Sequence, residues 1–221
     1  MENSENNKAL SGSFGWMMLG LLISAVVSVV VAATPSLVNI ILGSNIGFFA
    51  CIIVELGIVI YLSARIRKMS VFQAHFFFIL YAIASGLTLS VIFFAFETSS
   101  IISIFFGTAA MFGALALYGA TTKRDLTKFG TIAGFGLIGL VVAMLVNLFI
   151  QSSILDLVLS WIGVVVFTIL TAYDVQKIKT LVSITMIEED RKKASIIGAL
   201  KLYLDFINLF LDLLRIFGRR K

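Results

Sequence analysis

Seven stretches of predominantly apolar residues follow one another along the 221-residue chain. A helix of about 20 such residues, rising ~1.5 Å per residue, can cross the ~30 Å hydrocarbon core of a bilayer. Inside lipid the backbone must satisfy its own hydrogen bonds, which a helix does within one segment. We therefore expect an all-α membrane protein with seven transmembrane helices. The predicted spans are residues 14–34, 46–65, 72–96, 101–120, 129–150, 154–175 and 196–215.

The composition excludes an ordinary soluble domain. Apolar residues make up 60% of the chain and charged residues 13%, whereas soluble domains are about half apolar and about a quarter charged. The single proline suits long uninterrupted helices, because proline removes a backbone donor. The one cysteine, Cys51, excludes an intrachain disulfide and is typical of a small apolar core residue. No cysteine–histidine cluster suggests a metal site, and no tightly bound cofactor is expected.

The organisation along the chain is simple. The connections between spans are short, no linker long enough to separate domains is present, and no internal repeat is convincing. The N-terminal segment lacks the basic region and small-residue cleavage site of a secretory signal, so we expect the first span to be retained. The predicted parts are a cytoplasmic tail (1–13), one seven-helix transmembrane domain (14–218) and a basic tail (219–221).

Basic residues alternate from one connection to the next. Twelve of them lie before the first span and in the second, fourth and sixth connections, whereas the other three connections carry none. Loops rich in lysine and arginine stay in the cytoplasm, so we expect the N-terminus and these connections to be cytoplasmic. The net charge of +5 is then a topology signal, and nucleic-acid binding is not expected. The twelve are Lys8, Arg65, Arg67, Lys68, Lys123, Arg124, Lys128, Lys177, Lys179, Arg191, Lys192 and Lys193.

The last apolar segment leaves one choice open. If it crosses the membrane, Arg215, Arg219, Arg220 and Lys221 end on the outside, against the charge rule. If it re-enters, these residues return to the cytoplasmic side. Its apolar length is that of a full span and favours a crossing.

Four acidic residues lie inside the predicted spans: Glu55 in the second, Asp174 near the cytoplasmic end of the sixth, and Asp205 and Asp212 in the seventh. A charged side chain at the centre of a membrane helix costs at least about 2.5–3.5 kcal/mol, so each is a candidate functional residue. Asp205 lies about nine residues, or roughly 13 Å, into its span, far from interfacial water.

Two of these acids also have structural interpretations. Asp174 at the interface would be solvated and paired with a lysine of the following connection, Lys177 or Lys179. Glu55 would form a static salt bridge with a basic residue of the last helix.

The last span is amphipathic. Asp205 and Asp212 are seven residues apart, close to two helical turns, and so share one face. Such a face is sheltered from lipid at the centre of a bundle, so we expect this helix to be central, its polar face lining a cavity or pore. Alternatively, Asp212 is only the ion-pair partner of Arg215, three residues later. The full polar stripe is Lys201, Asp205, Asn208, Asp212 and Arg215.

Asp174 and Asp205 come from consecutive spans joined by a cytoplasmic connection, so they can face each other. Two carboxylates in a low dielectric cannot both ionise cheaply. Such a pair can share a proton and respond to pH, or it can hold a hard cation such as Ca²⁺. A nearby arginine would compete with both uses, and Arg65 lies at about the right depth to reach Asp174.

Glycines recur in the fourth and fifth spans. Small residues let helix backbones approach closely in lipid, where packing replaces the hydrophobic effect. The GxxxG pattern of Gly130 and Gly134 is weak, and we interpret it as packing within the protein rather than dimerisation.

Several longer motifs together resemble one family. The segments TAYDVQKIK (171–179) and ALKLYLDFINLFLDLLRIFG (199–218) resemble the Bax inhibitor-1 family, and SARIRKMS (63–70) leading into LYAIASGLTLSVIF (80–93) fits the same pattern. The resemblance covers essentially the whole chain from the first span onward. The short N-terminal tail is typical of a bacterial member.

The resemblance implies seven transmembrane helices with the last one central and surrounded by the other six, and a pH-sensitive calcium leak channel of a bacterial inner membrane. It implies that Asp174 and Asp205 form a pH-sensing pair on the ion pathway, with Ca²⁺ as the transported or regulatory ion and these two carboxylates as its ligands. It also implies an arginine latch on Asp174, for which Arg65 is our candidate and Arg67 the alternative.

The resemblance further implies a supporting acidic–basic pair, Glu55 with Arg215, between the second and last helices. Asp212 lies one turn before Arg215 and is grouped with this pair.

Two other functions are weighed against the leak channel. An intramembrane aspartyl protease would need GxGD at its second aspartate, whereas Leu202, Tyr203 and Leu204 precede Asp205 here, so no enzyme is expected. A regulator of other membrane proteins, such as a protease modulator or a stress or cell-death suppressor, stays open. The expected partners are the lipid bilayer, Ca²⁺, protons and, for a regulator, other membrane proteins.

Overall fold

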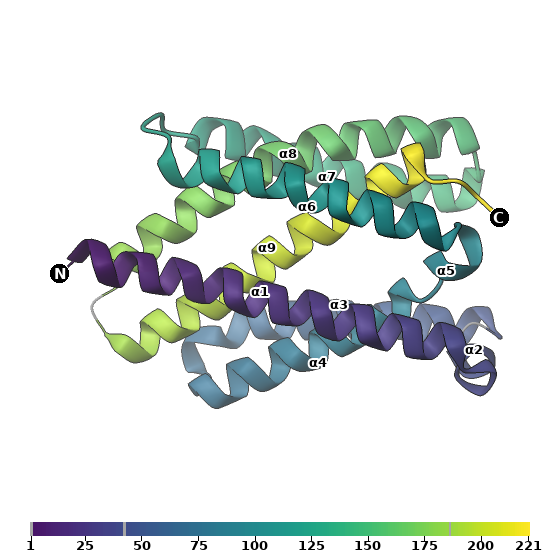
Figure 1. Ribbon diagram of the computed structural model, residues 1–221, viewed down its shortest axis with the longest axis horizontal. Coiled ribbons are helices and arrows are strands. Elements are labelled where there is room, and N and C mark those ends of the chain that lie inside the picture. The colour runs from purple at the N-terminus through teal and green to yellow at the C-terminus, as the bar shows by residue number, and fades with distance from the viewer. Residues whose placement is uncertain (1, 42, 186) are drawn as a thin grey trace. The chain divides into compact units, whose positions relative to one another are not determined.

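A computed structural model describes residues 2–41, 43–185 and 187–221. These residues form helices and short connections without a strand (Figure 1). Seven helices are long and apolar enough to cross a membrane, which confirms the predicted all-α, multi-pass membrane protein. The elements are α1 (Glu2–Ala33), α2 (Pro35–Ile41), α3 (Asn45–Arg65), the 3₁₀ turn η1 (Ile66–Lys68), α4 (Val71–Leu89), α5 (Ile92–Ala95), α6 (Thr98–Thr121), α7 (Thr127–Ile150), α8 (Ser153–Ile184) and α9 (Glu188–Phe217).

Three segments expected to be irregular are helical instead. Most of the N-terminal tail belongs to α1, α2 lies within the first connection, and the sixth connection (176–194) is largely the end of α8 and the start of α9. High charge suggested a loop at 176–194, but charged residues outside lipid also form helices when they pair along one face. Lys192 does so, with Nζ 2.8 Å from Oε1 of Glu188 one turn earlier.

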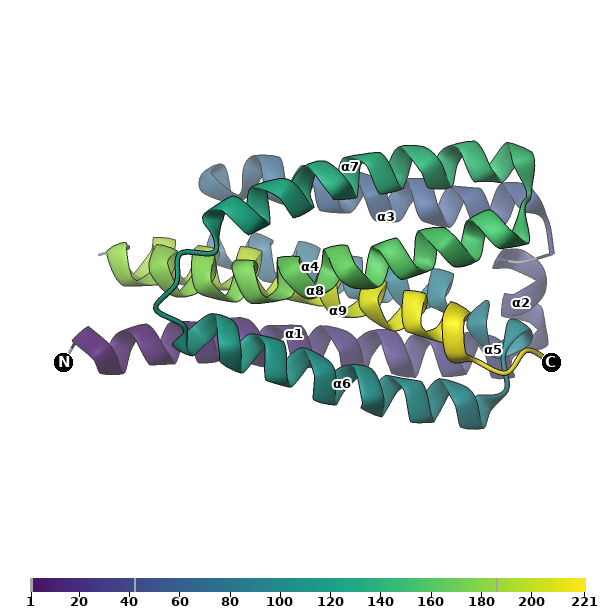
Figure 2. The same ribbon diagram turned by 90° about the horizontal axis from the view of Figure 1, so that it is seen from above.

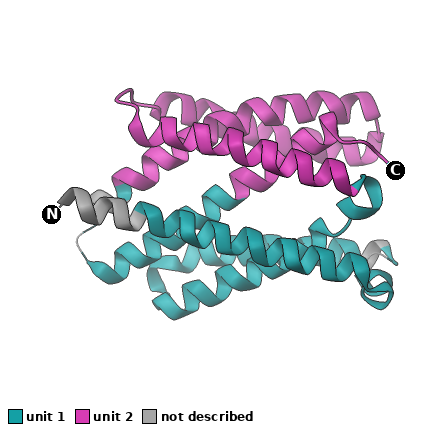
Figure 3. Ribbon diagram, in the orientation of Figure 1, with its two compact units in different colours: residues 1–97, 181–203, 221 teal, residues 98–180, 204–220 magenta. Residues whose placement is uncertain are grey.

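The chain divides into two compact units (Figure 3). Helix α9 contributes its first half to one unit and its second half to the other. The sequence predicted one seven-helix domain, and this division into units does not test that prediction. Unit 1 consists of residues 1–97, 181–203 and 221, and unit 2 of residues 98–180 and 204–220.

In unit 1, α1 and α4 pack closely because small residues let their backbones approach. A methyl group on Gly86 of α4 would collide with Val27 and with the carbonyl oxygen of Ser24, both of α1. A methyl group on Gly20 of α1 would collide with the ring of Phe78 in α4. The pattern is the one expected for helix packing in lipid, although the sequence had suggested it for other spans.

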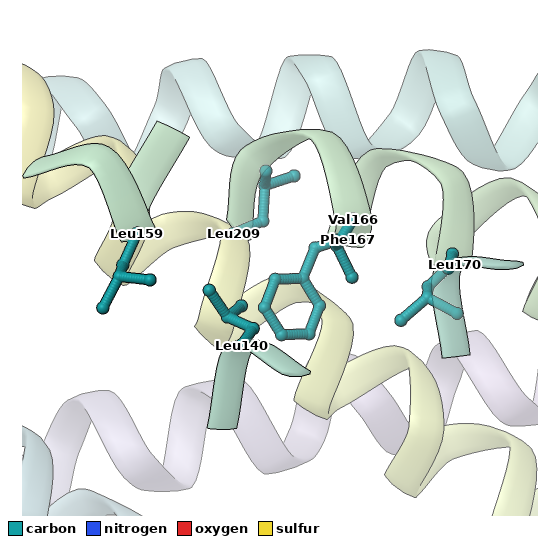
Figure 4. Close-up of a cluster of buried hydrophobic side chains, with 7 residues drawn as sticks. Leu140, Leu159, Val166, Phe167, Leu170 and Leu209 are labelled. Carbon is teal, nitrogen blue, oxygen red and sulfur yellow. The ribbon is translucent and has the colours of Figure 1, made fainter. Parts of the chain in front are cut away.

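Unit 2 is built around α8. Helices α7 and α8 run antiparallel, side by side, in both views (Figures 1 and 2). Leu209 of α9 is fully buried against side chains of both helices, so the second half of α9 packs on this pair (Figure 4). The buried cluster is Ala133, Leu140, Leu159, Val166, Phe167, Leu170 and Leu209.

The last helix is the most sheltered of the seven candidate spans. In its most apolar window 61% of the residues are buried, against 6–50% in the other spans. This burial supports the predicted interior position. At its end, the Arg219 amide donates to Ser100 Oγ at 3.2 Å, so the end of α9 lies beside the start of α6. Since α6 follows the third connection, which is predicted to be external, this placement agrees with a crossing rather than re-entry.

Candidate ion site in the sixth and seventh spans

Asp174 lies in a tightly packed part of α8. The preceding residue, Tyr173, has its ring where a Cβ on Gly130 of α7 would sit, and the Ala172 carbonyl lies equally close to Gly119 of α6. Gly130 and Gly119 therefore let α7 and α6 pack closely against α8 next to Asp174. Gly134, the second glycine of the GxxxG pattern, faces open space.

Polar contacts fix the same end of α8 to the connection before α7. Gln176 accepts a hydrogen bond from the Leu126 amide at 2.9 Å and donates one to the Arg124 carbonyl at 2.8 Å. Lys179 Nζ donates to the Ala120 carbonyl at 2.7 Å. These contacts set the position of α8 along its axis and therefore the depth of Asp174.

The Asp174 side chain is buried rather than interfacial. The residue is only 7% exposed, which does not fit a solvated carboxylate at the membrane surface. Lys177, one of the lysines considered as its partner, donates to the Tyr173 hydroxyl at 3.0 Å. Because it is buried, Asp174 is still a candidate functional acid.

Asp205 is 4% exposed and lies in the aromatic part of α9. Its neighbour Phe206 packs edge-on against Phe105 and Phe112 of α6, with ring centroids 5.3 and 5.5 Å apart. Aromatic rings exclude water from this part of unit 2, so the local dielectric is low and charge on Asp205 is costly.

Helix geometry predicts that Asp174 and Asp205 lie on facing sides of α8 and α9. Asp212 contacts Gly163, which defines where the helices meet. Asp174 is eleven residues after Gly163, close to three turns, and Asp205 is seven residues before Asp212, close to two turns. Each aspartate is therefore predicted to lie on the side of its helix that faces the partner helix. For straight antiparallel helices, the same spacing predicts an offset of about 6 Å along the helix axes, at ~1.5 Å per residue.

Asp212 has the ion-pair partner that the sequence suggested. Arg215 Nη1 lies 3.2 Å from Asp212 Oδ1, one helical turn away. Asp212 is 2% exposed, whereas the Arg215 side chain is 34% exposed. The contact with Gly163 was not expected, because nothing in the sequence connects these two positions.

Glu55 lies among hydroxyl groups of unit 1. The Thr88 hydroxyl, on α4, donates to Glu55 Oε2 at 2.8 Å. The side chains of Ser85 and Tyr81, also on α4, lie close enough to interact with the same carboxylate. The expected partner Arg215 belongs to unit 2, so the Glu55–Arg215 pair stays a prediction.

A second set of hydroxyls in unit 1 was missed in the sequence. Ser24 Oγ of α1 lies 2.7 Å from Tyr203 Oη of α9 and 2.6 Å from the Ala82 carbonyl oxygen of α4. A serine hydroxyl has one proton, and the carbonyl can only accept, so Tyr203 is the donor to Ser24. The ring of Tyr203 packs edge-on against Tyr81 at 5.2 Å. The sequence signal that could have pointed to a polar face on α4 is the spacing of Tyr81 and Ser85, which are one helical turn apart.

Arg65 is the last residue of α3, and both Arg65 and Arg67 are exposed. The predicted latch would join Arg65 of unit 1 to Asp174 of unit 2. It therefore stays a prediction.

The donor set available to a cation is small. Among the described residues, no group of three or more histidine, cysteine, aspartate and glutamate side chains comes together. Ca²⁺ takes about six to eight oxygen ligands, so Asp174 and Asp205 would supply the charge, with carbonyl oxygens and water completing the shell.

Known proteins match nearly the whole chain. The family described as inhibitor of apoptosis-promoting Bax1 matches residues 6–221. The inner membrane protein YbhL of Escherichia coli K12 is 47% identical over 210 residues, which cover 94% of this chain and 90% of YbhL. An uncharacterized protein of Borreliella burgdorferi is 42% identical over 218 residues, covering 97% of this chain and 93% of that protein. These matches confirm the resemblance seen in the motifs: the chain belongs to the Bax inhibitor-1 family.

Proposed function

We propose that the protein is a pH-sensitive cation leak channel, with Ca²⁺ as its main ion and the Asp174–Asp205 pair as its gate. The observation that supports this most is the burial of the carboxylates Asp174 and Asp205, which are 7% and 4% exposed in α8 and α9. Burying two acids inside membrane helices costs free energy, which makes a functional role the default hypothesis for both. The E. coli relative is an inner membrane protein, and we propose the same membrane here, with the N-terminus in the cytoplasm.

The proposed gating follows from the charges on the pair. When both aspartates are ionised, their repulsion is relieved by a dication or by the Arg65 guanidinium. Protonation of Asp174 removes the negative charge that holds Arg65, and the latch then opens. No catalytic role is proposed, because a leak requires only positioned charge.

Flux through the purified protein in liposomes tests this proposal. Asp174→Asn and Asp205→Asn keep the side-chain shape and remove the charge, so the affinity for Ca²⁺ should fall, because the ion loses half of its anionic ligands, and the pH dependence of the flux should flatten. Asp125→Asn, which changes an exposed acid in a connection of the same unit, is the matched control and should behave like wild type. If both buried variants keep wild-type flux and the same pH profile, the pair is structural.

The latch has its own test. Arg65→Ala should raise the resting leak at neutral pH, because Asp174 loses its neutralising partner. Arg67→Ala, two residues away and equally exposed, should leave the leak unchanged. The reverse result would transfer the latch to Arg67.

The competing proposal is a regulator of other membrane proteins. The family's description, inhibitor of apoptosis-promoting Bax1, names a regulatory activity. The same liposome experiment separates the two, because a regulator without its partner conducts no ions. Correctly inserted protein that gives no flux at any pH would favour the regulator.

A further inference from the structure

One carboxylate of unit 2 has no use in the proposed gate. Asp212 Oδ1 accepts a hydrogen bond from Arg215 Nη1 at 3.2 Å. Its second oxygen, Oδ2, is buried and has no hydrogen-bond partner within the part of the chain that the structure describes. A fully charged carboxylate normally accepts hydrogen bonds on both oxygens, because leaving one buried and unsatisfied is costly.

The surroundings of this oxygen decide what it can bind. Oδ2 occupies the place where a Cβ on Gly163 would sit, so it lies directly against the backbone of α8. Among the described residues, Asp212 does not belong to any group of three or more metal-ligating side chains. Ca²⁺, by contrast, needs about six to eight oxygen ligands. A proton needs no space and no ligand shell. The geometry therefore suits a proton and excludes a hydrated or coordinated cation.

The neighbouring charges allow both protonation states. The charged groups that act on Asp212 are Arg215 on its own helix and Asp156 near the start of α8. Arg215 favours the carboxylate, whereas Asp156 favours the neutral acid, because two like charges repel. The Arg215 side chain is 34% exposed and can be solvated on its own when Asp212 is neutral.

We propose that Asp212 is a proton-binding site of unit 2, distinct from the Asp174–Asp205 pair. A proton from water adds to Oδ2, the carboxylate becomes a carboxylic acid, and the ion pair with Arg215 becomes a hydrogen bond between a cation and a neutral group. The site lies two turns, or about 10 Å, from Asp205 along α9. It does not require the Asp174–Asp205 pair to conduct ions.

Infrared spectroscopy of the full-length protein in lipid tests this site directly. In the Asp174→Asn/Asp205→Asn background, acidification between about pH 9 and pH 5 should produce the carbonyl band of a carboxylic acid, shifted in D₂O. Adding Asp212→Asn should remove the part of this band that belongs to Asp212 and leave the part from other acids, such as Glu55. A band of unchanged intensity after Asp212→Asn, or the absence of any band in the background protein, would mean that Asp212 stays ionised and would overturn the proposal.

Two further variants provide a second reading should Asp212→Asn fail to insert. At a given pH, Arg215→Gln should strengthen the band, because the charge that favours the carboxylate is lost. Asp156→Asn should weaken it, because the repelling charge is lost. Arg219→Gln, an exposed arginine one turn further along the chain, is the control and should leave the band unchanged. Equal behaviour of all three variants would contradict the proposal.

Discussion

The two units surround a buried acid in opposite ways. In unit 1, Glu55 accepts a hydrogen bond from Thr88 at 2.8 Å, and further hydroxyls of α4 lie close to it. In unit 2, Asp212 lies against the bare backbone of Gly163, and Asp205 follows α9 into a cluster of phenylalanine rings. Hydroxyl donors and a nearby cation both favour the ionised form of a carboxylate, whereas burial in a low dielectric favours the neutral form.

This difference separates Glu55, which has uncharged hydroxyl neighbours, from Asp212, whose side-chain partner is the charged Arg215. Both acids lie in spans of similar length and apolar content, so the spans alone do not tell them apart. The immediate neighbours decide which carboxylate can exchange a proton. Unit 2 therefore contains the pH-dependent chemistry proposed here, and unit 1 contains a polar network that holds helices together.

The largest expected effect compares one acid of each unit directly. Since a step linked to one proton changes by up to about tenfold per pH unit, Asp205→Asn should remove most of the pH dependence of Ca²⁺ flux. Glu55→Gln should keep the pH profile, because Glu55 lies outside the proposed gate, although the size of the flux can change. Flux measured across the same pH series checks both. A flattened profile in Glu55→Gln would break the comparison between the units.

The next effect is steric and belongs to unit 2. Gly163→Ala should destabilise the protein by about 3 kcal/mol, because the new methyl group occupies the position of Asp212 Oδ2 and a packed interior has little room to adjust. Gly134→Ala is the control, since a methyl group there meets nothing within 4 Å. It should be neutral or stabilising by about 0.5–1 kcal/mol through helix propensity. Thermal unfolding in detergent measures both.

A smaller effect is expected in unit 1 when the donor to Glu55 is removed. Thr88→Val keeps the shape of the side chain and deletes the hydroxyl that donates to Oε2. Interhelical hydrogen bonds in membrane proteins contribute up to about 1.7 kcal/mol, and the charged acceptor favours the upper end of that range. We expect a loss of about 1.5 kcal/mol. No loss would show that water replaces the hydroxyl, and the contrast between the units would weaken.

The smallest effect concerns the hydroxyl pair that joins α9 to α1. Tyr203→Phe removes the donor to Ser24 and leaves the Ser24 contact with the Ala82 carbonyl intact. The expected loss is near the membrane-protein average of about 0.6 kcal/mol. Tyr61→Phe, at an exposed tyrosine of the same unit, should be silent. A loss above about 2 kcal/mol would mean that the whole network depends on Tyr203.

Much of the candidate site was visible in the sequence because it depends on local composition. Acids inside apolar runs are conspicuous, and their spacing placed Asp205 and Asp212 on one face of the last helix. The ion pair of Asp212 with Arg215 follows from a spacing of three residues and was also expected. The hydroxyls around Glu55 were not, since serine, threonine and tyrosine are ordinary in membrane helices and their partners come from other parts of the chain.

By itself, the sequence determined the seven spans, the all-α class and the acids that lie in them, because a bilayer selects for apolar length and each helix satisfies its own backbone. Tertiary structure decided the rest. It extended α8 and α9 through a charged connection, set the hydroxyls of α4 beside Glu55 and seated Asp212 against Gly163. These contacts join residues far apart in the chain, and their geometry depends on how close two backbones can approach, which only the packed helices establish.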